Sequence, residues 1–524
     1  MVRKAHNYGL GRRAARTGLA VLSGNLLSFI LGIALIVLVA RLLGPSAFGA
    51  FTIAVSYYLL VDAAFQYGIG TYVNKHMAQY SAGAKPDAHM LKKVFYSGFT
   101  LGLLLAVITA AVGITASFLV AGAYAKTGLT ATSFIIASCV IFFAILYGIS
   151  YSGLIGLGRA RAVAGVMSLQ SVAELVAAVS LILLGFGVDG ALAGIVIGYV
   201  FGFAAAFSEL VISLKRIVGR LLPSVLDIRD VVHFIAPLSV INIMSSAVSN
   251  FSTLLLGIFV SAAVMGSFGV AMRGVTGLTA VYVSITAALV PVFSILANST
   301  SGKSSKQHNE LVAYSLVLIM PMFAFVASLS KPLVFLLVSS KYAWAPLYLS
   351  LIAIGVAISL LGKFLSSLMI AKSDNKKLMQ FYAISTIAQL ALLLALVPIF
   401  KVVGAIVAVF FFGSAIFTWL VVRHSGRALN LDLDSRQLYR VFGSSIILGI
   451  LLLASYLAAV PIAELICGTV IAAVAYPALL GIMKALDKND IATIKEAIKG
   501  MPMHKIFDLL LDYTGLFVGR FNGL

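Results

Sequence analysis

Residues 26–40 read LLSFILGIALIVLVA, an uncharged run in which polar and apolar residues do not alternate. Residues 311–338, LVAYSLVLIMPMFAFVASLSKPLVFLLV, form a second run with one lysine. A helix of about 20 apolar residues, rising 1.5 Å per residue, crosses the hydrocarbon core of a bilayer. A membrane β-barrel would instead show short segments of alternating polarity. The two runs therefore predict membrane-spanning helices.

The composition of the whole chain agrees with this interpretation. Hydrophobic residues make up 61% of the 524 residues and charged residues 10%, against about 45–50% and about 25% in globular domains. The net charge of +20 would suggest nucleic-acid binding on a soluble domain. Here the basic residues fall in loops, so we expect no nucleic-acid partner. Cys139 and Cys467 lie inside apolar runs, where we expect core packing and neither a disulfide nor a metal site.

Apolar runs divide the chain into about fourteen predicted membrane spans, which gives an all-α membrane protein. Six spans form a predicted N-lobe at 18–214, namely 18–43, 48–69, 94–121, 133–157, 163–186 and 191–214. Six more form a predicted C-lobe at 231–422, namely 231–260, 266–296, 311–338, 346–371, 378–399 and 402–422. A final pair covers 441–483. The remainder is a basic N-terminus (1–17), a linker (215–230) and an amphipathic tail (484–524).

The basic residues test this count, because positively charged loops face the cytoplasm. With a cytoplasmic N-terminus, the count leaves five of the 37 Lys and Arg outside and two within spans. The outer five are Arg41, Lys126, Lys331, Lys341 and Lys401, and the two within spans are Arg273 and Lys363. All others fall on the cytoplasmic side. We therefore expect a multi-pass protein of the cell membrane with both termini in the cytoplasm.

The two sets of six spans resemble each other in residues as well as in number. Offsets of 217 and 215 align identical or similar residues at eight positions. They are Asn25/Asn242, Ser28/Ser245, Gly49/Gly266, Phe51/Phe268, Ala54/Ala271 and Ala173-Glu174-Leu175/Ala388-Gln389-Leu390. Because six is an even number, both copies start on the same side and are related by an axis along the membrane normal. A substrate site between the two lobes is then the default expectation.

Two carboxylates fall near the middle of predicted spans, where an unpaired charge is costly. Asp62 shares one helical face with Tyr58 and Gln66, and Glu174 follows Gln170 by one turn. One interpretation is buried structural polarity, with each carboxylate bonded to a neighbouring hydroxyl or amide. The other is coupling to H⁺ or Na⁺. We expect no other cofactor.

Two cations also lie inside spans. Arg273 lies on a stripe of small residues, and it either forms an ion pair, reaches the outer interface, or holds a phosphate or pyrophosphate head group. Lys363 either extends to the cytoplasmic interface or serves the same head group. The neutral stripes that contain Asn25 and Asn242 either let helices pack closely or supply hydrogen bonds to sugars in a shared cavity.

Motifs for catalysis and for ATP hydrolysis are missing from the sequence. No glycine loop followed by Lys-Ser/Thr is present, and no His and Cys cluster has the spacing of metal ligands. No large soluble segment offers a place for an active site. We therefore expect a transporter and not an enzyme.

The segment LVARLLGPSAFGAF, residues 38–51, resembles the signature after the first helix in the oligosaccharide flippase and polysaccharide biosynthesis family of the multidrug/oligosaccharidyl-lipid/polysaccharide (MOP) exporter superfamily. The resemblance extends over the whole chain, through Val290-Pro291 and the Gly-Ala pairs at Gly190 and Gly404. In helix count the chain is similar to the fourteen-helix members, which include the lipid II flippases. The final pair distinguishes it from the twelve-helix drug-efflux branch.

This resemblance implies a flippase that moves a lipid-linked oligosaccharide, a glycan on polyprenyl phosphate or pyrophosphate, from the cytoplasmic to the outer leaflet. It implies alternating access and a role in glycan or cell-envelope biosynthesis. Basic cavity residues bind the pyrophosphate in such proteins, and the matching candidates here are Arg273, Lys363 and Arg41, unless Arg41 only anchors its loop. We expect membrane lipids and envelope-glycan enzymes as partners, and a monomer.

Two alternatives stay open at this point. A cation-coupled multidrug exporter would use acidic cavity groups for cationic substrates. Asp62 and Glu174 are consistent with that alternative. A non-transporting scaffold of an envelope-synthesis complex would tolerate the loss of every charge within the spans.

Overall fold

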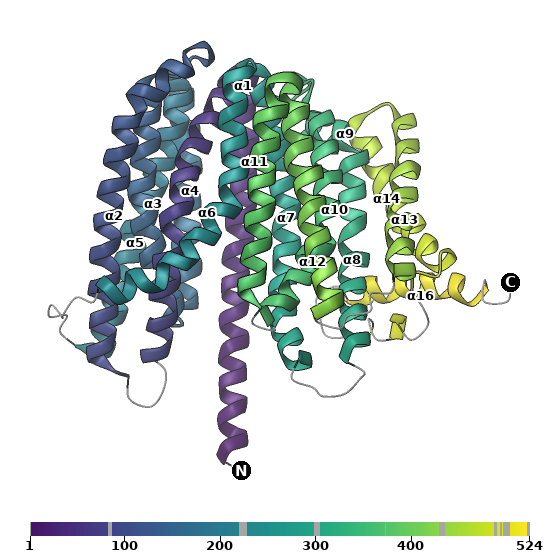
Figure 1. Cartoon of the computed structure of the whole chain (residues 1–524), viewed down its shortest axis with the longest axis horizontal. Coiled ribbons are helices and arrows are strands. Elements are labelled where there is room, and N and C mark those ends of the chain that lie inside the picture. Colours follow the sequence, from purple (N-terminus) through teal and green to yellow (C-terminus); the bar gives the residue numbers. More distant parts are fainter. Residues whose placement is uncertain are drawn as a thin grey trace. The chain divides into compact units, whose positions relative to one another are not determined.

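The computed structural model describes residues 2–81, 86–219, 228–297, 304–371, 374–428, 435–486, 490–492, 495 and 504–520 (Figure 1). Within these ranges every regular element is a helix. Helices satisfy their own backbone hydrogen bonds, which is the condition for crossing a bilayer that offers no water to the peptide groups. The all-α membrane fold expected from the apolar runs is therefore confirmed.

The chain forms two compact units, and the first ends at Gly266. Its helices are α1 (Val2–Ser81), α2 (Ala88–Ala123), η1 (Ala125–Thr127), α3 (Ala131–Gly156), α4 (Ala160–Leu181), η2 (Ile182–Phe186), α5 (Gly187–Val218) and α6 (Ile228–Phe259). Unit 1 also includes the start of α7 (Ala262–Ala297), because the boundary falls between Gly266 and Ser267. The lobe limits 18–214 and 231–422 remain a prediction.

Unit 2 continues from Ser267 to the C-terminus. After α7 its helices are α8 (Ser304–Ser328), α9 (Ser330–Leu337), α10 (Ala345–Ala371), α11 (Asn375–Ile406), η3 (Val407–Gly413), α12 (Ser414–Ala428), α13 (Ser435–Leu452), η4 (Leu453–Ala458), α14 (Pro461–Ile482) and α16 (His504–Arg520). Cys139 in unit 1 and Cys467 in unit 2 are both free thiols, but Cys467 is exposed, so the core packing expected for it is wrong.

Ten helical stretches in the described part of the chain are long and apolar enough to cross a membrane. Three of them contain a break at which the backbone leaves the helical region, at Gly44, at Gly185 to Gly187 and at Lys401. Counting the two halves of each broken stretch separately, and adding α6, gives fourteen spans. The predicted number of spans is therefore confirmed.

The internal repeat is visible in the backbone itself. Gly187 has φ 53° and ψ −128°, and Lys401, 214 positions later, has φ 51° and ψ −125°. This conformation is open to glycine but strains a residue that carries a side chain, as Lys401 does. Glu174 packs on Gly198, and Gln389 packs on Gly413, which are 215 positions later in each case. The two copies thus share a break and a helix crossing.

One predicted span is wrong in detail, because residues 311–338 form two helices that meet at Leu329 (φ −103°, ψ 24°). Pro332 lacks an N–H group, so it cannot donate to the carbonyl of Ser328 four residues earlier. The Tyr456 hydroxyl donates to that carbonyl instead, at 2.8 Å. Ser350 in α10 donates to the neighbouring carbonyl of Ala327 at 2.6 Å. Side chains from other helices therefore stabilise the break.

Candidate functional site

Unit 1 contains a buried polar cluster around Asp62 in α1. The Asp62 side chain is 7% exposed, and its Oδ1 atom has no hydrogen-bond partner among the described residues. Such a group is costly in an apolar surrounding unless a proton, a cation or water satisfies it. Asp62 is therefore the clearest candidate for an ion site in unit 1.

Glu174 in α4 is held by its neighbours. The Gln170 amide donates to Glu174 Oε2 at 2.6 Å, as the one-turn spacing predicted. Glycines on α5 make room for both side chains. A Cβ atom at Gly198 would lie 2.5 Å from Glu174 Cβ, and one at Gly202 would lie 2.9 Å from Gln170 Cβ. The amide thus fixes the orientation of the Glu174 carboxylate against the backbone of α5.

Tyr199 in α5 connects these groups. It lies within electrostatic range of Asp62, Glu174 and Tyr58. Its ring also meets the ring of Tyr147 edge-on, with 5.7 Å between centroids. We call Tyr58, Asp62, Tyr147, Glu174 and Tyr199 the acidic–aromatic cluster.

The structure thus relates two carboxylates that the sequence suggested separately, and it places Tyr58 beside them. The sequence analysis missed Tyr147 and Tyr199, because a tyrosine inside an apolar run carries no charge to mark it. Tyr199 lies between Gly198 and Gly202, and this spacing of small residues around one polar side chain was the available signal. The Gln66 side chain lies outside the described residues.

Lys363 in α10 has a partner inside unit 2. Its Nζ atom donates to the Tyr282 hydroxyl at 3.0 Å and lies 4.6 Å from the centroid of the Tyr282 ring. The ammonium therefore combines a hydrogen bond with a cation–π contact. Tyr382 in α11 lies within electrostatic range of Tyr282. The side chain of Lys363 in α10 is therefore held by contacts with Tyr282 of α7.

Arg273 in α7 is half-buried, and no described side chain forms a hydrogen bond or an ion pair with it. Nine residues separate Arg273 from Tyr282, which corresponds to about 180° around a helix at about 100° per residue. The partner of Lys363 therefore lies on the opposite face of α7 from Arg273. Among the described side chains, the hydrogen-bonding capacity of Arg273 is therefore unused.

Three other predicted residues are less informative in the structure. Arg41 has an exposed side chain three residues before the break at Gly44. Asn25 and Asn242 belong to α1 and α6, and their side chains lie outside the described residues. Their proposed contact with sugars stays a prediction.

Within the described ranges, no three His, Cys, Asp or Glu side chains gather closely enough to hold a metal ion.

A reciprocal glycine contact joins the part of α1 after Gly44 to the start of α7, inside unit 1. A Cβ atom at Gly49 would overlap the Ala262 carbonyl oxygen and lie 2.7 Å from the Gly266 nitrogen. A Cβ atom at Gly266 would overlap the Pro45 carbonyl oxygen. Gly49 and Gly266 are repeat equivalents, and so are Pro45 and Ala262. We call this symmetric contact the glycine crossing.

The neighbourhood of the glycine crossing is tightly packed. A Cβ atom at Gly257 in α6 would lie 2.9 Å from both Ile53 Cδ1 and Tyr124 Cε1. The Tyr124 hydroxyl donates to the Leu254 carbonyl at 2.7 Å. Burial raises the pKa of Tyr124 to about 12, so its hydroxyl remains a donor at neutral pH. By the predicted topology this region lies at the outer end of its helices.

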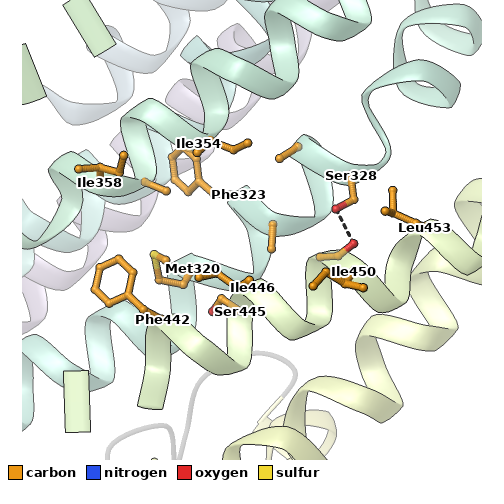
Figure 2. Close-up of a pocket in the computed structure, with 14 residues that line it drawn as sticks. Met320, Phe323, Ser328, Ile354, Ile358, Phe442, Ser445, Ile446, Ile450 and Leu453 are labelled. Atoms are coloured by element: carbon orange, nitrogen blue, oxygen red, sulfur yellow. Dashed lines mark hydrogen bonds between the residues drawn. The ribbon is translucent and has the colours of Figure 1, made fainter. Parts of the chain in front are cut away.

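Unit 2 also carries an apolar groove of about 380 Å³ between α8, α10 and α13 (Figure 2). Met320 and Phe323 line it from α8, Ile354 from α10, and Phe442 and Ile450 from α13. Its polar atoms are largely satisfied internally, since Ser328 donates to the Gly449 carbonyl at 2.8 Å. Ile354 and Ile450 are 46% and 63% exposed, so the groove opens at the surface of the helices. An apolar chain fits this lining.

The chain is similar to a known protein family and to several solved structures. A family model described as "Polysaccharide biosynthesis protein" matches residues 38–347. No curated protein sequence matches the chain significantly. Among solved structures, a lipid II flippase MurJ in an inward closed conformation superimposes with a TM-score of 0.71 at 15% identity, and the alignment covers 88% of this chain and 98% of that one.

Two further structures have the same fold at lower similarity. An inward-facing multidrug resistance MATE family transporter of the MOP superfamily gives a TM-score of 0.58 at 14% identity, covering 80% of this chain and 99% of that one. A MOP superfamily transporter from Pyrococcus furiosus gives 0.53 at 15% identity, covering 80% and 95%. At these identities the likeness establishes a fold, and it is the fold expected from residues 38–51.

Proposed function

The chain belongs to the polysaccharide biosynthesis protein family, and from that premise we propose that it flips a lipid-linked oligosaccharide from the cytoplasmic to the outer leaflet of the cell membrane by alternating access. The observation that carries this proposal is Arg273, a half-buried guanidinium at membrane depth with no partner among the described side chains. A guanidinium binds phosphate through two parallel hydrogen bonds. An anionic head group is the natural occupant of such a position.

The polyprenyl tail of this substrate does not need a polar route. It remains in lipid or in an apolar groove while the glycan and its phosphates pass through protein, which avoids the cost of burying polar groups in hydrocarbon. The groove between α8, α10 and α13 supports this division, because it is apolar and open at the surface. We assign the tail to the groove and the head group to Arg273.

The acidic–aromatic cluster supports coupling of transport to H⁺ or Na⁺. The Asp62 carboxylate, whose Oδ1 atom has no hydrogen-bond partner among the described residues, gains most from a bound proton or cation, and Tyr199 lies within electrostatic range of both Asp62 and Glu174. Uptake and release of the ion would then accompany the change of access.

An Asp62→Asn substitution tests this coupling. We expect exchange driven by a pH or Na⁺ gradient to fall to the gradient-free rate, because an amide keeps the shape of the side chain and cannot bind or release a proton. The measurement compares exchange in vesicles with each gradient and without any. Glu464→Gln is a matched control, because Glu464 is 8% exposed in α14, in the other unit. Gradient dependence that survives Asp62→Asn would contradict the assignment.

A second candidate function is a cation-coupled multidrug exporter. The aromatic rings and carboxylates of the acidic–aromatic cluster favour it, because such groups attract organic cations. Arg273 argues against it, since a cation with no partner among the described side chains repels such substrates.

The deciding experiment uses purified protein in vesicles with a fluorescent polyprenyl-pyrophosphate oligosaccharide. We expect leaflet exchange well above that of protein-free vesicles. Uptake of organic cations without lipid exchange would instead identify a drug exporter. Neither activity, in protein that is folded and monodisperse, would favour the non-transporting scaffold.

A further inference from the structure

The two backbone breaks that the repeat shares, between η2 and α5 in unit 1 and inside α11 in unit 2, are tight turns without a polar loop. A Cβ atom at Gly190 would lie 2.8 Å from Phe186 Cβ, and one at Gly404 would lie 3.1 Å from Phe400 Cβ. The two phenylalanines are repeat equivalents, and so are the two glycines. In each turn the chain after the break therefore packs directly on the residue before it.

The side chains before both breaks are apolar and exposed. In unit 1, Leu184 is 73% exposed and Phe186 is 61% exposed, and in unit 2, Ile399 is 71% exposed and Phe400 is 57% exposed. Apolar side chains at the end of a membrane span favour lipid, whereas the peptide groups at a break need water or head groups. Both needs are met at the boundary between acyl chains and head groups. The turns therefore mark the depth of that boundary.

The two turns differ in charge. Lys401 is the only charged residue between Lys377 and Arg423, and its side chain is exposed. The equivalent residue in unit 1 is Gly187, which is followed two positions later by the carboxylate of Asp189. Glycine adopts this backbone conformation without strain. The lysine therefore adds an ammonium group to the second turn at the expense of a strained backbone.

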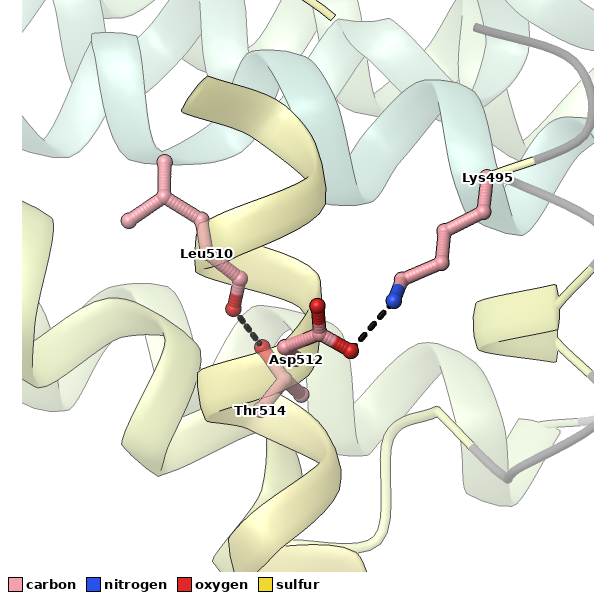
Figure 3. Close-up of polar contacts among 4 residues, drawn as sticks. All are labelled: Lys495, Leu510, Asp512 and Thr514. Atoms are coloured by element: carbon pink, nitrogen blue, oxygen red, sulfur yellow. Dashed lines mark hydrogen bonds and ion pairs between the residues drawn. The ribbon is translucent and has the colours of Figure 1, made fainter. Parts of the chain in front are cut away.

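The ammonium of Lys401 is not used within the described part of the protein. No described side chain forms a hydrogen bond, an ion pair or a cation–π contact with it. Other lysines of unit 2 do have such partners, since Lys363 donates to Tyr282 and Lys495 forms an ion pair with Asp512 (Figure 3). A lysine at the membrane boundary extends its ammonium toward the head groups, where it attracts phosphate.

We propose that Lys401 binds the head group of an anionic phospholipid, while Ile399 and Phe400 lie among the acyl chains beside it. The ammonium binds the phosphate, and the net charge of the lipid decides between candidates. In phosphatidylcholine the choline cation offsets the phosphate, whereas phosphatidylglycerol keeps a net negative charge. By the predicted topology the bound lipid belongs to the outer leaflet. This lipid site is separate from the positions assigned to the transported substrate.

The test places one tryptophan probe at each turn of the full-length chain. The two native tryptophans, Trp344 and Trp419, are replaced by phenylalanine, and Phe400→Trp is added. Phe186→Trp is the matched control, because it puts the same probe at the equivalent turn without a lysine. Vesicles contain phosphatidylcholine and phosphatidylglycerol, with either lipid brominated along its acyl chains. The ratio of the two quenching values gives the relative affinity of the lipids beside the probe. Lys401→Gly and Lys401→Gln are then combined with the probe at 400.

We expect phosphatidylglycerol to be preferred about fivefold beside the probe at 400, and no such preference beside the probe at 186. Lys401→Gly and Lys401→Gln should both abolish the preference, because both remove the charge. Lys401→Gly should also raise the midpoint of thermal unfolding, because it removes the backbone strain.

Equal quenching by the two lipids at 400 would overturn the proposal, and so would a preference that survives both substitutions of Lys401. A preference of the same size at both turns would also overturn it, since the preference would then not come from the lysine. Quenching of the probe at 400 by aqueous iodide and by neither lipid would show that the turn faces water, which contradicts the lipid site.

Discussion

Replacing Gly49 by alanine is expected to reduce leaflet exchange roughly tenfold or more, a change of about 1.4 kcal/mol. The added methyl group would overlap the Ala262 carbonyl oxygen, which is backbone and cannot move aside as a flexible side chain would. Insertion of a methyl group into a closely packed contact typically costs about 1–3 kcal/mol. The substitution therefore opposes the conformation in which the glycine crossing is closed.

The repeat makes the same prediction for the other half of the contact. Gly266→Ala would place a methyl group on the Pro45 carbonyl oxygen, so its effect should match that of Gly49→Ala. The double substitution should cost little more than either single one, because all three disrupt one contact. Labelling from outside at a cysteine near the crossing should increase in each variant, if closure of the crossing seals the outer side.

Gly32→Ala is the matched control for this series. It lies in the same helix, α1, and a Cβ atom there has no neighbour within 4 Å. We expect exchange within about twofold of the wild type, because a methyl group in open space causes no strain. Wild-type exchange by folded Gly49→Ala protein would show that the glycine crossing takes no part in transport.

The fold was largely predictable because its dominant signal is local. Each span is recognisable as an apolar run of sufficient length, and the positions of the basic loops limit the number of spans. The repeat was visible in pairs such as Gly49 and Gly266, but their direct contact was not, since sequence offset carries no information about distance. The break at Leu329 was missed because the proline that causes it lies inside a run that is otherwise uniformly apolar.

The candidate site was predictable only where charge marks it. Asp62, Glu174, Arg273 and Lys363 stand out because ionisable residues are rare in spans. Neutral residues that lie beside some of them come from distant parts of the chain. Tyr282 accepts a hydrogen bond from Lys363, which is 81 residues later in the chain. Tyr199 lies near Asp62 and Glu174 but belongs to a third helix. Such tertiary pairing decides which charges are engaged, and the sequence alone does not reveal it.

The state of the two intramembrane cations leads to the second large prediction. Arg273→Ala should reduce exchange of a polyprenyl-pyrophosphate substrate by roughly tenfold or more, because hydrogen bonds to a charged group contribute about 1.5–3 kcal/mol. Arg273→Lys should recover part of the rate, since an ammonium keeps the charge and loses the paired geometry. The measurement is leaflet exchange at subsaturating substrate, with protein stability followed in parallel.

Lys363→Ala provides the comparison, because its ammonium already has the Tyr282 hydroxyl and ring as partners. We expect a smaller loss of exchange than for Arg273→Ala, together with a larger loss of thermal stability, since the substitution leaves Tyr282 without its cation. A substrate with one phosphate should narrow the difference between wild type and Arg273→Ala, because fewer acceptor oxygens face the guanidinium. Equal exchange by wild type and Arg273→Ala would contradict the assignment of the head group to Arg273. A larger loss of exchange in Lys363→Ala than in Arg273→Ala would assign the head group to the Lys363–Tyr282 pair of unit 2 instead.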